Sequence, residues 1–350
     1  MRRHHRLYLL IGLALLGGAG GLHYRHSPPD YTDPAIAGAF RSDVVDTHGR
    51  LSVRGTQLVD ERGAPVILRG LAAHGPQWFP LVDGWSIPSM VRMFGVDAVR
   101  IPMYIEAANP ADPSDRWGGY TVNQGYMLER LRAGVEDALD AGIYVLIDWH
   151  IHDDPTLYTE EAVAFFDRIS AEYGEHPNVI YEICNEPAYV GWPEVKRYAE
   201  AVIPAIRRND PDNLILVGTP TWSQDIDAPA DDPLAFEGIM YTVHYYAGNH
   251  PLDVMLAKVD YALGAGLPVF VSEWGSSDVM NTTSNFAIAE VWVAALEARG
   301  LSWLSWSLGN KDEPSSALTP EAPLSGPWTE ADLTEAGRWL LPYFRPEVSP

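Results

Sequence analysis

The sequence predicts an α/β fold, a single (β/α)8 TIM barrel preceded by a short N-terminal hairpin. Between residues 66 and 305, eight short runs rich in β-branched and apolar residues alternate with longer segments of helical periodicity. That alternation is typical of parallel strands joined by helical crossovers. The residues that follow these runs are polar or aromatic, as expected where the strands of a barrel open onto a substrate site.

The expected strands lie at residues 66–72, 97–102, 143–149, 179–184, 214–217, 239–243, 269–272 and 302–305. Helical patterns between them include residues 124–141, 160–173, 192–209, 251–263 and 285–299. Residues 219–237, where Pro and Asp dominate, are expected to be mostly loop. Near the start, residues 51–58 and 65–68 flank a turn at residues 60–63, which predicts the hairpin.

The first 26 residues have the character of an export signal or an N-terminal anchor. Three arginines precede residues 7–22, which carry no charge and are apolar or small. This length fits the h-region of a signal better than a full membrane span. The sequence therefore predicts a secreted or periplasmic protein, or one anchored to a membrane through residues 7–22 if the leader stays. Residues 27–46 are expected to be a linker, and residues 47–345 the folded domain.

The composition favours a neutral or cationic partner. The chain has 350 residues and a formal charge of −23, and its four N-terminal arginines lie within the predicted leader. A surface that acidic repels nucleic acid and anionic lipid. Acidity that only maintains solubility is an equal alternative. Twelve Trp and seventeen Tyr supply flat rings that suit stacking on sugars or an ordinary core.

The single cysteine, Cys184, limits the chemistry of the chain. One cysteine excludes an internal disulfide and a thiolate metal cluster. Because its neighbours are apolar, Cys184 is interpreted as a small core residue rather than a nucleophile.

Two predicted strands end in a glutamate followed by a chain breaker. The run from Val179 to Pro187 ends in Asn185-Glu186-Pro187, and the run from Pro268 to Gly275 contains Glu273. A lone glutamate in this position is usually a surface charge or a helix-start residue. Two carboxylates across one site are what cleavage of a glycosidic bond requires, one as acid and the other as nucleophile.

Other strand ends carry side chains with further chemistry. A buried Arg100 needs a carboxylate partner, for which Glu273 and Glu182 are the two candidates. The pair His150-Ile151-His152 is a possible metal site of the amidohydrolase type. That type places its His-x-His at the first strand and needs further His and Asp ligands, whereas this pair follows the third predicted strand and the fourth ends in Asn-Glu. Large rings at strand ends are individually more often core than sugar platforms. The remaining strand-end candidates are His74, Trp78, Tyr104, Trp222, His244, Tyr246, Trp306, Lys311 and Glu313.

Taken together, these motifs resemble a glycoside hydrolase of family 5, close to its bacterial endo-β-1,4-glucanase (cellulase) branch. The motifs that carry the resemblance are Ile180 to Pro187, Val243 to Gly248, Val271 to Gly275 and Asn310 to Leu318. One departure is the segment from His152 to Pro155, which is shorter than the corresponding loop common in that family.

The resemblance implies a retaining enzyme that needs no cofactor or metal. It implies that Glu186 is the acid/base and Glu273 the nucleophile, with Arg100 and Tyr246 supporting the nucleophile and Asn185 binding a sugar 2-hydroxyl. His150, His244 and Trp306 would line the same subsite, and Trp222 would lie toward the leaving group. Glycone-side sugars would contact His74, Trp78, Tyr104, Lys311 and Glu313.

The implied partner is a β-1,4-linked polysaccharide or oligosaccharide. The protein is expected to be a monomer and to bind no nucleic acid. A mannanase, xylanase or mixed-linkage glucanase on the same barrel is the alternative within this class. A carbohydrate-binding protein that no longer turns over is the alternative outside it.

Overall fold

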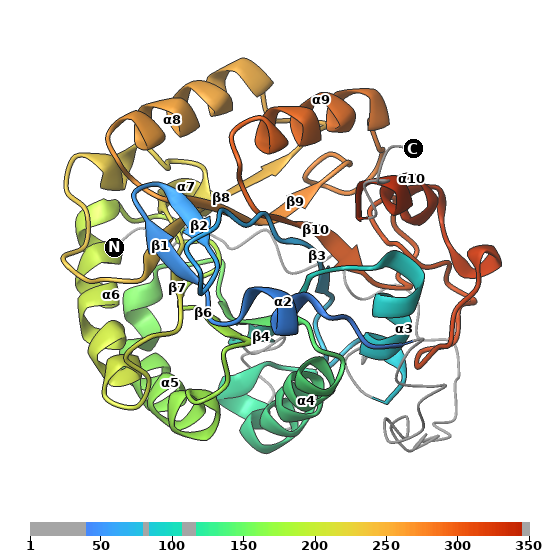
Figure 1. Cartoon of the computed structure of the whole chain (residues 1–350), viewed down its shortest axis with the longest axis horizontal. Coiled ribbons are helices and arrows are strands. Elements are labelled where there is room, and N and C mark those ends of the chain that lie inside the picture. Colours follow the sequence, from blue (N-terminus) through green and yellow to red (C-terminus); the bar gives the residue numbers. More distant parts are fainter. Residues whose placement is uncertain (1–39, 80–83, 107–116, 345–350) are drawn as a thin grey trace, which may run out of the picture.

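A computed structural model of the protein describes residues 40–79, 84–106 and 117–344. Eight parallel strands close into a barrel in the order β10-β3-β4-β5-β6-β7-β8-β9, with helices around the outside (Figure 1). The strands are β3 (Arg69–Ala73), β4 (Ala98–Tyr104), β5 (Tyr144–His150), β6 (Val179–Glu182), β7 (Ile215–Val217), β8 (Ile239–Tyr246), β9 (Val269–Gly275) and β10 (Trp303–Leu308). The predicted fold class is confirmed.

Helices follow the strands as crossovers, as the periodicity predicts. The five predicted helices correspond to α4 (Tyr120–Asp140), α5 (Thr159–Tyr173), α6 (Trp192–Arg207), α8 (Leu252–Gly264) and α9 (Phe286–Glu297). Also present are α3 (Ser86–Phe94), α10 (Glu335–Phe344) and the single turns η1 (Pro155–Tyr158), α7 (Pro220–Ser223), η2 (Ala228–Ala230) and η3 (Glu330–Asp332). The predicted loop at residues 219–237 contains only two of these turns, so it is mostly loop.

Several strands extend further toward their carboxyl ends than the sequence predicts. β8 continues to Tyr246, β9 to Gly275 and β10 to Leu308. His244, Tyr246, Glu273 and Trp306 therefore lie inside strands, where the sequence placed them just after strand ends. Pairing between neighbours explains the extension, because His244 pairs with Glu273 in the parallel ladder of β8 and β9.

The hairpin is present, but its turn lies earlier than predicted. β1 (Ser52–Arg54) pairs antiparallel with β2 (Gln57–Val59), so residues 51–58 form both strands instead of one. Gly55 takes the positive φ of 63° that this tight turn requires. The predicted turn at residues 60–63 also exists and is closed by an antiparallel bridge between Val59 and Pro65.

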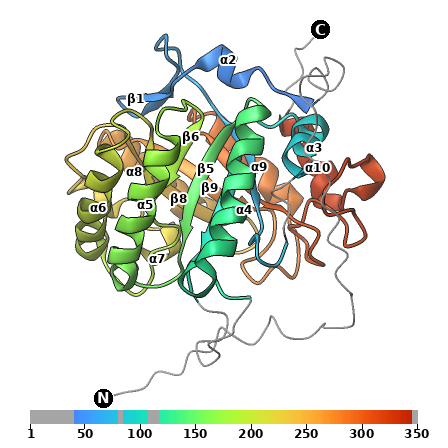
Figure 2. The same cartoon turned by 90° about the horizontal axis from the view of Figure 1, so that it is seen from below.

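The end of the predicted linker is folded. α2 (Val44–His48) begins within the predicted linker at residues 27–46 and extends into the predicted domain. The Phe40 ring packs edge-on against Trp85 at 5.2 Å between ring centroids. Figure 2 shows the hairpin and α2 at one end of the barrel and α7, which follows β7, toward the other end. The predicted leader and residues 27–39 lie outside the described residues. Within the described ranges no helix combines the length and apolarity needed to cross a membrane.

One continuous hydrophobic core connects the strands with the surrounding helices. Cys184 is fully buried in it, as predicted, and burial raises the pKa of its thiol well above the ordinary value. Several ionisable side chains are buried as completely as this core. Arg100, Asp148 and Glu182 have no exposed surface, and Glu273 is 5% exposed. Buried charges require partners, and these partners define the site.

Candidate active site

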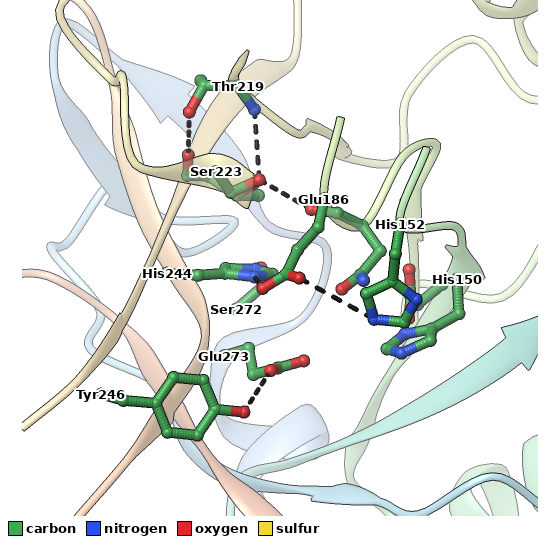
Figure 3. A network of polar contacts seen from close by, with 12 residues as sticks. His150, His152, Glu186, Thr219, Ser223, His244, Tyr246, Ser272 and Glu273 are labelled. Atoms are coloured by element: carbon green, nitrogen blue, oxygen red, sulfur yellow. Dashed lines mark hydrogen bonds and ion pairs between the residues drawn. The ribbon is translucent and has the colours of Figure 1, made fainter. Parts of the chain in front are cut away.

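The fold brings the two predicted glutamates together. Glu186 follows β6 and Glu273 lies in β9, 87 positions apart in the sequence. One oxygen from each carboxylate and one ring nitrogen of His244 all lie within 4.8 Å of one another. Figure 3 shows both carboxylates turned toward the same space.

Glu273 is held by two hydrogen-bond donors. Arg100 Nη1 donates to Glu273 Oε2 at 2.8 Å, and Tyr246 Oη donates to Oε1 at 2.7 Å. Burial and the charge of Glu273 raise the pKa of Tyr246 well above its ordinary value, so the phenol keeps its hydrogen. Both oxygens of the Glu273 carboxylate are thus held in place by donors from other strands.

Arg100 contacts both of the carboxylate partners that the sequence left open. Besides Glu273, it donates from Nε to Glu182 Oε2 at 2.6 Å. Its Nη2 donates to Asn185 Oδ1 at 2.5 Å and lies 2.9 Å from Asp148 Oδ2. Burial opposes the charge of Arg100, but Asp148, Glu182 and Glu273 outweigh it and raise the pKa of the guanidinium. Arg100 is thus a fixed cation at the centre of the site.

His150 is held by a carboxyl group that the sequence interpretation did not single out. Its Nδ1 lies 2.6 Å from Asp148 Oδ2. Burial lowers the pKa of His150 well below its ordinary value, so the ring is neutral. Burial, with the nearby charges of Glu182 and Glu273, raises the pKa of Asp148. Asp148 thus orients His150 while also lying beside the Arg100 guanidinium.

Glu186 faces histidines instead of fixed donors. Its Oε1 lies 3.1 Å from His244 Nδ1, and its Oε2 lies 3.8 Å from His152 Nε2. The side chain of Glu186 is 12% exposed, compared with 6% for Glu273. Glu186 is therefore the more accessible carboxylate, and its main partner can gain or lose a proton.

A hydrogen-bonded chain fixes the proton on the far side of the His244 ring. Ser272 Oγ donates to Glu182 Oε1 at 2.6 Å, so it can only accept from His244 Nε2, 2.8 Å away. Nε2 therefore carries a hydrogen, and one further proton lies between Nδ1 and Glu186. Burial opposes a charged ring, but hydrogen bonding with Glu182 and Glu186 outweighs it and raises the pKa of His244 to about 9.

The same contacts act in the opposite direction on Glu186. Burial favours the neutral acid, but hydrogen bonding with His244 and the charge of that ring outweigh burial and lower the pKa of Glu186. The shared proton accordingly lies on His244 in the unliganded protein. Glu186 and His244 form one acid–base pair whose proton can be passed to Glu186.

On the β3 and β10 side, predicted sugar-binding residues form a continuous group of rings. The Trp306 ring lies 5.1 Å from His74 and stacks on His150 at 5.8 Å, and Tyr104 lies 4.1 Å from His150 and 4.9 Å from Trp78. Trp78 is 36% exposed, whereas Trp306 is 8% exposed and mostly core. Within this group of rings, Trp78 is therefore the ring that is most accessible to solvent.

The predicted pair Lys311 and Glu313 adjoins this group. Lys311 Nζ lies 2.5 Å from Glu313 Oε2, and Glu313 Oε1 lies 3.9 Å from His74 Nε2. Burial, together with the charge of Lys311, lowers the pKa of His74 to about 3, so the ring is neutral. Since the Gly75 N–H donates to His74 Nδ1, the ring hydrogen lies on Nε2 and faces Glu313.

Trp222 lies on the opposite side of the barrel from these rings. It follows β7, and β3 and β7 are four places apart in the ring of eight strands. Trp222 is 36% exposed and meets Tyr189 edge-on at 5.6 Å between ring centroids. Tyr189, 71% exposed, was not predicted from the sequence, where only its position three residues after Glu186 marked it.

The pair His150 and His152, considered as an alternative metal site, does not form a common ligand group among the described residues. The rings meet edge-on with centroids 4.7 Å apart, and Asp148 already engages Nδ1 of His150. The three side chains close enough to share an ion are Glu186, His244 and Glu273. The unexpected members of the site, Asp148 and Ser272, had a weak signal in the sequence, since each lies one or two residues from a predicted site residue. His152 was singled out from the sequence only as a possible metal ligand.

This site, built from two close carboxylates at the carboxyl ends of barrel strands, defines a glycoside-hydrolase type of active site. The family model Cellulase (glycosyl hydrolase family 5) matches residues 59–312, and the chain belongs to this family.

Curated relatives and solved structures agree with this membership. The chain is 41% identical over 298 residues to an endoglucanase of Clostridium saccharobutylicum and 44% identical over 294 residues to endoglucanase A of Evansella cellulosilytica. These matches cover 83% and 82% of this chain but only 64% and 58% of the relatives, so the chain spans about three fifths of their length.

Among solved structures, the catalytic domain of a Thermobifida fusca endoglucanase, in complex with cellotetraose, aligns with a TM-score of 0.80 at 32% identity. The alignment covers 86% of this chain and 99% of that domain.

Proposed function

We propose that this protein is a retaining endo-β-1,4-glucanase that cleaves internal bonds of β-glucan by double displacement. The distance between Glu186 and Glu273 carries the proposal. Retaining enzymes place their two carboxyl groups about 5–5.5 Å apart, whereas inverting enzymes leave about 6.5–9.5 Å for a water molecule. Oxygens of the two groups within 4.8 Å of each other fit retention.

Glu273 is the proposed nucleophile. Its two oxygens accept hydrogen bonds from Arg100 and Tyr246, so the carboxylate is held in a fixed orientation. It would attack the anomeric carbon and form a glycosyl ester. Because the Arg100 guanidinium already contacts Glu273, the site does not need to reorganise when the carboxylate forms its bond to the sugar and is neutralised.

Glu186 is the proposed acid and then base. A proton passed from His244 Nδ1 to Glu186 would protonate the leaving oxygen in the first step. In the second step Glu186 would remove a proton from the water that hydrolyses the ester, and His244 can store that proton. A partner whose pKa is raised to about 9 keeps the proton available at neutral pH.

A neutral β-1,4-glucan is the proposed substrate. Two curated relatives carry the name endoglucanase, and the Thermobifida fusca domain was solved with cellotetraose. Asn185 is proposed to bind the 2-hydroxyl next to the cleaved bond. Trp222, with Tyr189, would contact sugars on the leaving-group side. His150, His244 and Trp306 would line the same subsite as Asn185. The proposed glycone-side residues are His74, Trp78, Tyr104, Lys311 and Glu313.

We also propose that the protein is exported as a monomer, either secreted or held at a membrane by residues 7–22. An uncharged N-terminal run after three arginines supports export. Cell fractionation, with N-terminal sequencing of the recovered protein, distinguishes a cleaved leader from an anchor.

Hydrolysis of defined oligosaccharides followed by NMR tests the activity. The proposal expects cleavage of β-1,4-linked glucose oligomers with the β-anomer formed first. Initial formation of the α-anomer would overturn retention, and preference for mannan, xylan or mixed-linkage glucan would reassign the substrate. Failure to release reducing sugar from carboxymethylcellulose and the other polymers would support a binding protein without turnover. Activity lost on chelation and restored by a divalent metal would indicate metal-dependent hydrolysis.

A further inference from the structure

A left-handed turn follows β7 and carries Trp222. Thr221, Trp222 and Ser223 have φ values of 59°, 54° and 57°, so three consecutive residues with side chains adopt the left-handed region. This conformation brings Cβ close to the following carbonyl oxygen and is seldom adopted by residues other than glycine. Such strain persists only where surrounding contacts impose it.

Ser223 makes the contacts that hold this turn. It is fully buried, and its Oγ accepts from Thr219 N at 3.2 Å and lies 3.4 Å from Thr242 Oγ1. Its own hydroxyl hydrogen is donated to the backbone oxygen of Asn185 at 2.7 Å. A single serine thus connects the turn after β7 with the residue before Glu186.

A second hydrogen bond connects the same turn with the residue after Glu186. Trp222 N donates to the backbone oxygen of Pro187 at 3.0 Å. The carbonyls on both sides of Glu186 are therefore held by adjacent residues of the left-handed turn. Gly218 allows this approach, since a Cβ there would lie 2.9 Å from the Asn185 oxygen and 2.8 Å from Pro187.

The backbone N–H groups of this segment point to the other neighbouring strand. Asn185 N donates to Trp149 O and Glu186 N donates to Ile151 O, each at 3.1 Å. The segment is consequently fixed on one side by the end of β5 and on the other by the turn after β7. Within the described part of the chain, the Glu186 side chain has two polar partners, His244 and His152, whose positions depend on other strands. The direction of the side chain is therefore set mainly by these backbone contacts.

We propose that Ser223 is a positioning residue for Glu186, which it aims at the leaving oxygen by holding the Asn185 carbonyl. Because the same left-handed turn presents Trp222, it also fixes the leaving-group sugar relative to the acid. The inference rests on the proposed role of Glu186 as the acid. A displacement of a catalytic group by about 1 Å can lower the rate by roughly 100-fold.

The test compares aryl β-cellobiosides with leaving groups of graded pKa. A poor leaving group such as phenol needs a proton from Glu186, whereas 2,4-dinitrophenol does not. Because kcat/KM reports the first, acid-assisted step, Ser223→Ala should lower it about 10- to 100-fold for phenyl cellobioside. For the dinitrophenyl substrate the change should stay within about 3-fold, so dependence on leaving-group pKa becomes steeper.

Ser223→Gly separates the hydroxyl from backbone strain. Glycine adopts a positive φ without strain, so this variant relieves the turn while removing the same hydrogen bond. The proposal expects the same selective loss as in Ser223→Ala. Recovery of wild-type kcat/KM in Ser223→Gly would overturn it, because strain in the alanine variant would then explain the loss.

Ser302→Ala provides the matched control. Ser302 is a buried serine whose Oγ accepts from Leu68 N at 2.9 Å, next to the start of β10 and away from Glu186. Its loss should lower the melting temperature without changing the leaving-group dependence. If both Ser223 variants lose activity equally on all substrates, or lose only stability as the control does, Ser223 is purely structural. A wild-type protein inactive on every cellobioside would instead refute the proposed function.

Discussion

The ends of β6 and β9 present the same residue type in two different environments. Glu273 in β9 lies between a guanidinium and a phenol, neither of which exchanges its proton near neutral pH. Glu186 after β6 is more exposed and faces His244, a side chain that does exchange its proton. The comparison shows that the environment, and not the glutamate itself, distinguishes a carboxylate held by fixed donors from one that shares a proton with a histidine.

The difference follows from where each residue lies in its element. Glu273 is part of a strand paired with β8, so His244 and Tyr246 of that strand are placed beside it by the ladder. Glu186 lies four residues beyond the end of β6 and depends on hydrogen bonds from the ends of β5 and β7. A strand thus fixes the proposed nucleophile, and a connecting segment holds the proposed acid.

Glu273→Gln is the strongest way to break the comparison. Without the attacking carboxylate, kcat/KM should fall by more than about 10⁴-fold on every substrate, whatever its leaving group. Rates on dinitrophenyl cellobioside and cellotetraose measure this. Glu297→Gln is the control, since Glu297 also pairs with an arginine, Arg69, but far from the site. Comparable activity in wild type and Glu273→Gln would disprove the nucleophile assignment.

Glu186→Gln should have a smaller and selective effect. An amide cannot donate the proton that a poor leaving group needs, so cleavage of cellotetraose should slow by about 10²- to 10⁴-fold. The rate at which dinitrophenyl cellobioside forms the glycosyl ester should remain close to that of the wild type. The initial burst of released dinitrophenol measures this rate. An equal loss of both rates would contradict the division of roles between the two glutamates.

Tyr246→Phe sharpens the comparison on the nucleophile side. It removes one hydrogen bond to a charged group, which contributes about 1.5–3 kcal/mol, so kcat/KM should fall about 10- to 150-fold. The loss should be the same for good and poor leaving groups, in contrast to Glu186→Gln. Tyr181→Phe is matched, because Tyr181 is also buried and donates to a carboxylate, Asp210, outside the site. A loss confined to poor leaving groups would connect Tyr246 with the acid instead.

The smallest expected effect is the dependence on alkaline pH. The pKa of His244 is raised from 6.5 to about 9 by its partners, so its contribution to stability is fully present below pH 6.5 and is lost as the pH rises through 9. On the order of 3 kcal/mol of unfolding free energy should disappear over this window. The kcat/KM for phenyl cellobioside should decline over the same range as the pair loses its proton.

Chemical denaturation at several pH values, compared with His244→Gln, measures this contribution. The wild-type unfolding free energy should approach that of the variant above pH 9. A difference between the two that stays constant from pH 6 to pH 10 would show that His244 does not carry the proton.

Much of this molecule was predictable because its signals are local. β-Branched runs and helical periodicity determined the eight strands and the principal helices, since both depend on which faces are buried. The sequence also identified Glu186 and Glu273 as the two carboxylates to bring together. The turn of the hairpin was misplaced because Gly55 sits inside a run that reads as a single strand.

Tertiary structure alone decided how those residues act on each other. The sequence left Arg100 a choice between Glu182 and Glu273, and the closed barrel gives it both. The chain from Glu182 through Ser272 to His244 joins three strands, so no local pattern could indicate it. The same holds for Ser223, which reaches Asn185 across 38 positions. The local sequence determines which elements form and which side chains they carry. The proton affinities of those side chains arise from neighbours that only folding brings into contact.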